Sequence, residues 1–452
     1  MTSSMSSKAV PWTFISAFYN PQICRVILHI DIEKCNYTNV IVEPHPESSE
    51  SSRAGSRYLE NRLVELHAEK PETECATFER DQIIEQILTL CRNEYGRSAP
   101  SFGSVIYALT VDGVFQVRAM PDHRLVQALR NPAETFGDDL PLPPLVPRTE
   151  LQPVAGTGQF LLSQTRLVRY NGKLYIAKGP LYPQRALLDL SEVKNLLALP
   201  ARHPNVIGPP TALITLGETD DRVCGFLTTY HCNGNVEFYA RKLREQGKLS
   251  PKLLFKWALQ LVDAVAFLAR HSTFHGDLKP DNIVVTDKED IVLIDFTRLF
   301  TTFVTASPEV RKLCAGSGGT KLGIPAHWPM ESVLSSEVYS IGRTLYLLCE
   351  GFKMAEVYQE MGWTKDAPFP TEFAPDSPTP PELQKIISLC VSQEPSQRPS
   401  LDALSKMLRA AQKRYTVKWR FSRSTSPRHQ QSKSEGKVGP GTFYMIRSKL
   451  LY

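Results

Sequence analysis

Alternating blocks of apolar and polar residues around position 280 predict a polar loop followed by a short hairpin. The apolar blocks 283–285 and 291–294 consist of Ile, Val and Leu and are bounded by Asp and Lys. Runs of this length and β-branched content are typical of buried strands. The polar residues 275–282, which are His-Gly-Asp-Leu-Lys-Pro-Asp-Asn, precede the first strand. Side chains at the ends of a small rigid hairpin are well placed to form a functional site.

The same pattern predicts further strands, and two turn dipeptides join four of them into hairpins. The dipeptides are Asp112-Gly113 and Asn171-Gly172, each between two apolar stretches. Both favour the left-handed backbone conformations that a two-residue hairpin turn requires. The predicted strands are residues 26–32, 105–111, 114–119, 165–170 and 174–178.

Apolar residues at helical spacing predict several helices. Ser250 followed by Pro251 is a good helix start, because serine caps the first turn and proline suits the first helical position. The predicted helices cover residues 77–92, 185–199, 250–268 and 335–348.

The helix 185–199 carries an acid, Glu192, on the same face as Leu188, Leu196 and Leu199. A carboxylate within an apolar stripe costs several kcal/mol unless a cation pairs with it. Lys178, near the end of the preceding strand, is the natural candidate. The alternative is that Glu192 lies at the edge of the helix and reaches water.

Residues 1–138 are expected to form a separate α+β accessory region, in which we find no catalytic constellation. The stretch 139–149 is rich in proline and interrupts all periodicity, which favours extended polyproline geometry. We interpret it as a linker or a strap against the next domain, and a docking ligand for a partner is the alternative.

Composition adds limits. A chain of 452 residues has room for two or three domains, and no run of about 18 apolar residues predicts a membrane span. The N-terminus does not resemble a secretory signal. Nine dispersed cysteines suit reduced thiols in an intracellular protein, cytoplasmic or nuclear, better than disulfides or zinc sites.

The net charge of +5 is unevenly distributed. Residues 413–452 carry +9 and the remaining residues −4, so basic character belongs to the C-terminal tail. We therefore infer no nucleic-acid-binding fold. The tail is expected to be disordered, with an anionic partner as the alternative.

The polar loop and hairpin resemble the catalytic and metal-binding loops of protein kinases, H-R-D-x-K-x-x-N followed by D-F-G. His275, Asp277, Lys279, Asn282, Asp295 and Phe296 match, whereas Gly276 replaces Arg and Thr297 replaces Gly. The resemblance implies that Asp277 accepts the proton of the substrate hydroxyl and that Lys279 offsets charge on the γ-phosphate. It also implies that Asn282 and Asp295 bind Mg²⁺.

The resemblance extends towards the N-terminus. Gly156 and Gly158 precede Lys178 at the spacing of a glycine-rich loop, although Leu161 stands in place of the third glycine. It implies that these glycines and the Lys178–Glu192 pair hold the phosphates of ATP. Backbone groups from Tyr230 to Cys232 would then contact adenine.

Towards the C-terminus, residues 323–331 resemble the end of a kinase activation segment. The resemblance implies a structural ion pair between Glu331 and Arg398. In addition, Glu337-x-x-Ser340-x-Gly342 resembles the motif D-x-W-S-x-G.

The sequence therefore predicts an α+β, bilobal protein-kinase-like fold, with an antiparallel sheet and one helix in the N-lobe and a mostly helical C-lobe. The expected divisions are the accessory region 1–138, the linker 139–149, the kinase domain 150–412 and the basic tail 413–452. The implied function is ATP- and Mg²⁺-dependent phosphorylation of Ser or Thr in a protein substrate. A pseudokinase scaffold and, less favoured, a small-molecule phosphotransferase are the alternatives.

Overall fold

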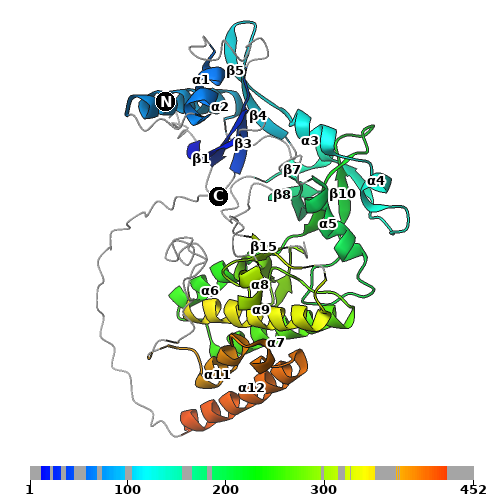
Figure 1. Ribbon diagram of the computed structural model, residues 1–452, viewed down its shortest axis with the longest axis vertical. Helices are drawn as coiled ribbons and strands as arrows, with labels where there is room; N and C mark the ends of the chain where they lie inside the picture. Colours follow the sequence, from blue (N-terminus) through cyan, green and yellow to red (C-terminus); the bar gives the residue numbers. More distant parts are fainter. Residues whose placement is uncertain are drawn as a thin grey trace, which may run out of the picture. The chain divides into compact units, whose positions relative to one another are not determined.

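The computed structural model forms two compact units (Figure 1). The first comprises the described residues up to Leu197 together with Pro209–Tyr230. The second comprises Ala198–Gly208 and the described residues from His231 onward. The structure describes residues 12–20, 24–31, 37–44, 58–68, 74–96, 104–154, 165–180, 186–296, 300–313, 321–325, 327–351, 373, 375 and 377–424.

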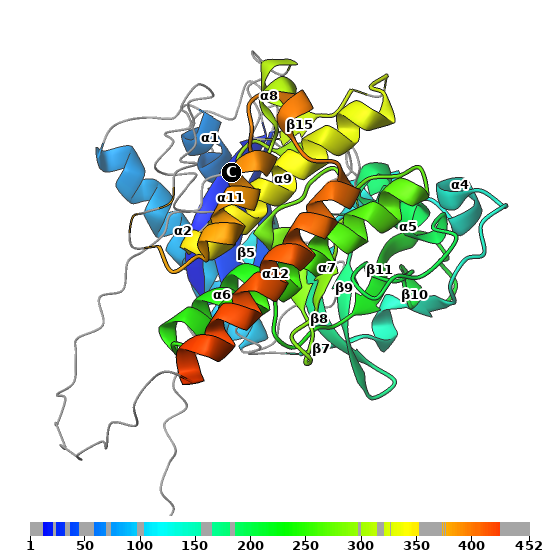
Figure 2. The same ribbon diagram turned by 90° about the horizontal axis from the view of Figure 1, so that it is seen from below.

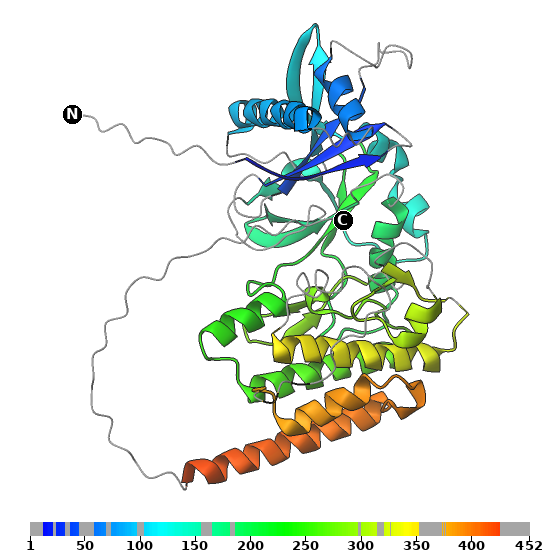
Figure 3. The same cartoon turned by 60° about the vertical axis from the view of Figure 1, so that its left-hand side comes forward.

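The first unit contains a five-stranded sheet with the strand order β1-β2-β3-β4-β5 (Figure 3). The β3–β4 pair is parallel and the other pairs are antiparallel. The turn between β4 and β5 has left-handed backbone at Asp112 and Gly113, as the sequence predicts. The strands are β1 (Thr13–Asn20), β2 (Arg25–Asp31), β3 (Tyr37–Val42), β4 (Ser104–Val111) and β5 (Val114–Pro121).

Helices α1 (Leu59–Ala68) and α2 (Glu74–Tyr95) pack on one face of this sheet. Alternate residues of the strands, such as Val26 and Leu28 of β2, belong to their shared core. Arg25 and Tyr107 occupy the intervening positions of β2 and β4, so pleating directs them to the opposite face. The predicted helix 77–92 is confirmed and extends by one turn or less at each end.

A second sheet of the same unit has the order β6-β10-β11-β9-β8-β7. All its pairs are antiparallel except β6–β10, and Asn171-Gly172 forms the predicted left-handed turn of the β8–β9 hairpin. Helix α5 packs against it. The elements are β6 (Leu145–Pro147), β7 (Gln152–Pro153), β8 (Thr165–Tyr170), β9 (Lys173–Lys178), α5 (Ala186–Leu197), β10 (Ala212–Thr215) and β11 (Val223–Thr229).

Between the two sheets the chain forms α3 (His123–Ala128) and α4 (Pro132–Phe136), capped by the side chains of Asp122 and Asn131. Strand β6 lies in the proline-rich stretch and pairs with β10, and Pro144 accepts a hydrogen bond from the backbone of Leu213. The stretch therefore makes the contacts of a strap. The division at residues 139–149 stays a prediction.

The second unit is mostly helical, and α7, α9, α11 and α12 pack on one another (Figure 2). Gly342 of α9 lies where α11 approaches closely, because a Cβ there would come within 2.6 Å of the Cβ of Cys390. The helices are α6 (Val236–Glu245), α7 (Pro251–Arg270), α8 (Pro308–Leu313), α9 (Met330–Glu350), α11 (Pro381–Cys390) and α12 (Leu401–Ser424).

The second unit also contains two small antiparallel strand pairs. Strand β12 (Ile283–Val285) pairs with β13 (Ile291–Leu293), which confirms the predicted hairpin, and β14 (Phe300–Thr302) pairs with β15 (Lys321–Gly323). The 3-10 turns are Arg148–Glu150 in the first unit and Pro280–Asn282 and Pro395–Gln397 in the second.

One expectation about the tail is wrong. Residues 413–424 continue helix α12 to Ser424, and Tyr415 packs against Phe255 of α7 with ring centroids 6.0 Å apart. The basic composition concealed an amphipathic helix whose apolar side covers α7. Residues 425–452 lie outside the described part of the chain. Within the described part, no helix is both long and apolar enough to cross a membrane.

Burial keeps several cysteine thiols protonated. Cys224, Cys349 and Cys390 are buried and free, and burial raises the pKa of each to about 12. They are inert core residues, as the dispersed cysteines predict.

Candidate active site

Helix α7 delivers the chain to the polar loop. Ser250 caps its first turn by accepting a hydrogen bond from the backbone of Leu253, and Pro251 occupies the first helical position. Its predicted buried stripe is confirmed. The helix ends at Arg270, and the loop enters the core within five residues.

His275 is fully buried, and hydrogen bonds fix both of its ring nitrogens. Nδ1 lies 3.2 Å from the backbone N of Asp277 and Nε2 lies 2.9 Å from the carbonyl of Ile294. This pattern assigns the proton to Nε2, and burial lowers the pKa of the imidazole. The ring also contacts Phe296, at 4.8 Å between centroids. The expectation of a packed, hydrogen-bonded core histidine is confirmed.

Glu337 of α9 holds the backbone of this loop from below. Its two carboxylate oxygens accept hydrogen bonds from the backbone N–H groups of His275 and Gly276, at 3.2 and 2.8 Å. Gly276 has φ +90°, a conformation that side chains disfavour, so glycine suits this position. The resemblance of Glu337-x-x-Ser340-x-Gly342 to a loop-supporting motif thus has a physical basis.

The Asp277 carboxylate is almost completely buried, and three groups fix its orientation. One oxygen accepts a hydrogen bond from the backbone N–H of Thr302 at 2.6 Å. The other lies 3.2 Å from the side-chain nitrogen of Asn282 and 3.1 Å from Nζ of Lys279. Lys279 also donates to the hydroxyl of Thr302 at 3.0 Å. Strand β14 is therefore tied to both residues to which the sequence assigns catalysis.

Asn282 and Asp295, the candidate metal ligands, flank the β12–β13 hairpin. The side-chain nitrogen of Asn282 also donates to the carbonyl of Asp277, which turns its amide oxygen the other way. Asp295 has φ +71°, an uncommon left-handed conformation that re-aims the chain directly after β13. A carboxylate and an amide oxygen are donors that suit Mg²⁺, which usually takes only one or two protein ligands besides water and phosphate.

Within the described residues, no three His, Cys, Asp or Glu side chains cluster as a self-sufficient metal site.

In the first unit, Lys178 at the end of β9 forms a salt bridge with Glu192 of α5. The Glu192 side chain is only 4% exposed, so it lies inside the apolar stripe rather than at a wet edge. The pair predicted from the sequence is therefore present.

The remaining predicted nucleotide contacts are Gly156 and Gly158 for the phosphates and the backbone from Tyr230 to Cys232 for adenine. Gly156 and Gly158 lie outside the described residues. Tyr230 is half-buried and Cys232 is exposed, and the chain passes from the first unit to the second between Tyr230 and His231. Their roles towards adenine stay predictions.

Comparison with known proteins decides the family. A family model described as the protein kinase domain matches residues 184–409, half of the 452 residues. The chain belongs to the protein kinase family. The match confirms the expected fold, a sheet-rich N-lobe and a helical C-lobe. Lys178 precedes the matched residues, so its assignment rests on the geometry of the first unit, whereas that of Gly156 and Gly158 rests on the sequence alone.

Curated relatives include plant and animal kinases. CBL-interacting serine/threonine-protein kinase 16 of Arabidopsis thaliana is 25% identical over 264 residues, 55% of this chain and 52% of the relative. CBL-interacting serine/threonine-protein kinase 10 of the same plant is 26% identical over 211 residues, 44% and 39%. The hormonally up-regulated neu tumor-associated kinase homolog B of Xenopus laevis is 26% identical over 219 residues, 44% and 31%. The chain spans about half or less of the length of these relatives.

The predicted ion pair between Glu331 and Arg398 is wrong. Arg398 instead binds Glu309 of α8 in a two-pronged contact, with nitrogen–oxygen distances of 2.6 and 2.8 Å. Glu331 is exposed in the first turn of α9, where the helix dipole favours an acid. Ser307-Pro308-Glu309 thus takes the place of the kinase Ala-Pro-Glu motif, and the activation segment from Asp295 to Glu309 is short.

Sequence reasoning missed both Glu309 and Thr302. A signal for Glu309 was present, because Ser307-Pro308-Glu309 retains the Pro-Glu pair that Pro329-Met330-Glu331 lacks. No local pattern marks Thr302 among its neighbouring threonines.

Proposed function

We propose that this chain is an ATP-dependent protein kinase that phosphorylates Ser or Thr of a protein substrate. The observation that carries the proposal is the orientation of the Asp277 carboxylate by Thr302, Asn282 and Lys279. A carboxylate held in this way is ready to orient a hydroxyl group, and positioning supplies most of the catalysis of phosphoryl transfer.

In the proposed reaction, the substrate hydroxyl oxygen attacks the γ-phosphorus of ATP while its proton passes to Asp277. A bond forms between that oxygen and phosphorus, and the bond from phosphorus to the β–γ bridging oxygen breaks, so ADP leaves. Lys279 offsets the negative charge on the transferred group. A bound Mg²⁺, held by Asn282 and Asp295, would neutralise charge on the phosphates.

Lys178 would contact the α- and β-phosphates, and Glu192 would hold its amine in place. Backbone N–H groups around Gly156 and Gly158 would approach the phosphates, and the backbone from Tyr230 to Cys232 would bind adenine. The basic tail, residues 413–452, remains a candidate surface for an anionic partner.

Preference for Ser and Thr over Tyr has two supports. Lys279 lies in a Leu-Lys-Pro sequence two residues after Asp277. The names of the two Arabidopsis relatives also describe serine/threonine kinases.

A pseudokinase is the alternative that specific residues favour. Thr297 follows Asp295-Phe296 where the family has glycine, and Leu161 replaces a glycine of the phosphate-binding loop. The retention of Lys178, Glu192 and the Asp277 network argues for an active enzyme. A small-molecule phosphotransferase is less favoured, because the Glu309–Arg398 pair closes an activation segment of protein-kinase type.

The test is transfer of radiolabel from ATP to generic protein substrates, followed by phosphoamino-acid analysis. We expect phosphoserine and phosphothreonine, a requirement for added Mg²⁺, and a loss of about 10³-fold or more in Asp277→Asn. Asp287→Asn, at an exposed position in the turn of the β12–β13 hairpin, is the matched control and should keep full activity. Equal low incorporation by the wild type and Asp277→Asn would identify a pseudokinase.

A further inference from the structure

Helix α5 carries Glu192, and its apolar side is covered partly by residues from outside the six-stranded sheet. Phe136 of α4, which is 5% exposed, shares a buried cluster with Leu190 and Val193 of α5. Leu140 and Leu142 pack against the same cluster. The strands β10 and β11 supply its other members. The ring of Phe136 therefore lies between the helix and the sheet that bears Lys178.

The segment preceding Phe136 is fixed to the same sheet. Leu125 and Leu129 belong to a second buried cluster with residues of β8, β9, β10 and β11. The carbonyl of Arg130 accepts a hydrogen bond from the backbone of Val223 at 2.8 Å, at the start of β11. Arg222 donates to the carbonyl of Val126 at 2.9 Å. Apolar burial and backbone pairing together hold α3 and α4 in one place.

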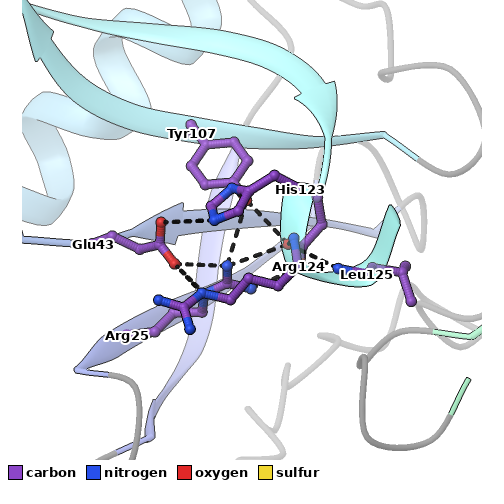
Figure 4. Close-up of polar contacts among 7 residues, drawn as sticks. Arg25, Glu43, Tyr107, His123, Arg124 and Leu125 are labelled. Carbon is purple, nitrogen blue, oxygen red and sulfur yellow. Dashed lines mark hydrogen bonds and ion pairs between the residues drawn. The ribbon is translucent and has the colours of Figure 1, made fainter. Parts of the chain in front are cut away.

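A polar network ties this segment to the five-stranded sheet (Figure 4). Arg25 of β2 contacts Asp122 at 2.7 Å and Glu43 at 2.6 Å, and the Arg25 and Asp122 side chains are only 2% and 3% exposed. Asp122 also caps α3, and it accepts a hydrogen bond from Tyr107 at 3.1 Å. Glu43 contacts Arg124 as well, at 3.1 Å.

This arrangement is expensive to break. Removing one partner of a buried ion pair leaves an uncompensated charge away from water, so the network specifies one position of α3 on the sheet. A path therefore leads from Arg25 and Asp122 to α3, along the chain to Phe136 of α4, and through the buried cluster of Phe136 to α5, the helix that carries Glu192.

We propose that residues 122–142 position helix α5 for the Lys178–Glu192 pair, with Phe136 as the positioning residue. The accessory region then supports nucleotide binding in cis. A 12-residue helix depends on tertiary contacts for its placement. A cavity in place of the Phe136 ring would let α5 shift, and shifts of about 1 Å impair phosphate positioning.

The first test is amide hydrogen exchange of the full chain, which does not depend on activity. In Phe136→Ala, we expect exchange of residues 190–197 to accelerate roughly tenfold. Ile87→Ala is the matched control, because Ile87 is equally buried but lies in the core between α2 and the five-stranded sheet. It should leave α5 unchanged. Unchanged α5 exchange in Phe136→Ala, or equal acceleration in both variants, would overturn the proposal. Phe136→Leu replaces the alanine variant if that variant does not accumulate.

The second test is a double-mutant cycle on kcat/KM for ATP, and this arm rests on the proposed function. Phe136→Ala should lower kcat/KM about tenfold in the wild type but less than about twofold in Glu192→Gln, because Phe136 acts through Glu192. A merely structural residue would give equal losses in both backgrounds, which would contradict positioning. An inactive wild type would refute the proposed function, and the exchange experiment would still decide this inference.

Discussion

Two ion pairs of this chain differ in how completely the protein encloses the cation. In the first unit, Lys178 is 17% exposed and meets Glu192 with a single ammonium group. In the second, the Arg398 side chain is 1% exposed, grips both oxygens of Glu309, and donates to the carbonyls of Ser392 and Ser335. The face of Tyr339 lies 5.1 Å from its guanidinium carbon.

This difference in exposure of the cation indicates which pair can bind a ligand and which stabilises the fold. A lysine ammonium that keeps some solvent access beside its carboxylate can still be reached by a phosphate. An arginine that is saturated by carboxylate, carbonyls and a ring can only fasten α8 and α9 to the loop before α12. Exchanging the two cation types is therefore the sharpest way to test the comparison, since each exchange preserves charge.

The largest effect is expected from Lys178→Arg. The positive charge stays beside Glu192, so the free energy of unfolding should change by less than about 1 kcal/mol. The planar guanidinium does not reproduce the compact ammonium, and kcat/KM for ATP should fall about 10³-fold. Steady-state kinetics and urea unfolding of the same preparation measure both quantities.

Lys173→Arg is the matched control for this exchange, because Lys173 begins the same strand and is exposed. It should keep wild-type kinetics. If Lys178→Arg retained a third or more of wild-type activity, the pair would be structural and the comparison would fail.

The converse variant, Arg398→Lys, should affect stability instead. A lysine amine replaces at most part of the contacts, which leaves buried carbonyls and one carboxylate oxygen unpaired. We expect the free energy of unfolding to fall by about 3 kcal/mol, with unchanged kcat per folded molecule. Urea unfolding with active-site titration separates the two.

Glu331→Gln and Glu309→Gln test which acid the arginine uses. The change at exposed Glu331 should alter the unfolding free energy by no more than about 0.5 kcal/mol, whereas Glu309→Gln should resemble Arg398→Lys. A large loss in Glu331→Gln would restore the pairing that the sequence suggested.

The same two pairs show what the sequence predicts well and why it fails elsewhere. Lys178 and Glu192 are fourteen residues apart, on a strand and a helix whose periodicity is strong, so their meeting follows from local patterns. Arg398 and Glu309 are separated by 89 residues, and their pairing depends on how three helices pack. Periodicity does not show which residues pair over such a distance. Two proline-containing stretches each contain a candidate glutamate, Glu309 or Glu331, and the sequence pattern does not distinguish between them.

Hairpins and buried helices were predictable because local sequence also specifies them. Asp112-Gly113 and Asn171-Gly172 specify their turns by backbone chemistry alone. The accessory contacts were not predictable, because Phe136 follows no periodic stretch and the fully buried members of its cluster lie 54 or more residues later. The continuation of α12 was missed because the high charge of residues 413–424 suggested disorder. The helix is stabilised there by packing against α7, which is distant in the sequence.

Glu337 extends the comparison to an acid without a cationic partner in the contacts described above. Its carboxylate accepts hydrogen bonds from two backbone N–H groups, whereas that of Glu309 pairs with Arg398. Burial raises the pKa of Glu337 to about 7, against the opposing hydrogen bonds from Gly276 and His275. For Glu309, burial acts in the same direction, but the hydrogen bonds and charge of Arg398 outweigh it and lower the pKa. The two acids therefore influence stability with opposite signs.

Glu337→Gln tests the predicted direction in which the contribution of Glu337 to the free energy of unfolding changes with pH. Between about pH 4.5 and 7 the native state keeps a proton on Glu337 that the unfolded chain has released, so the contribution of Glu337 to stability declines as pH rises. The stability of the wild type relative to Glu337→Gln should fall by on the order of 2 kcal/mol from pH 5 to pH 8. Wild type relative to Glu309→Gln should instead lose stability only as pH falls below about 4.5. Urea unfolding across this range measures both curves, and a pH-independent Glu337 difference would mean that the two N–H donors keep that carboxylate ionised as effectively as an arginine does.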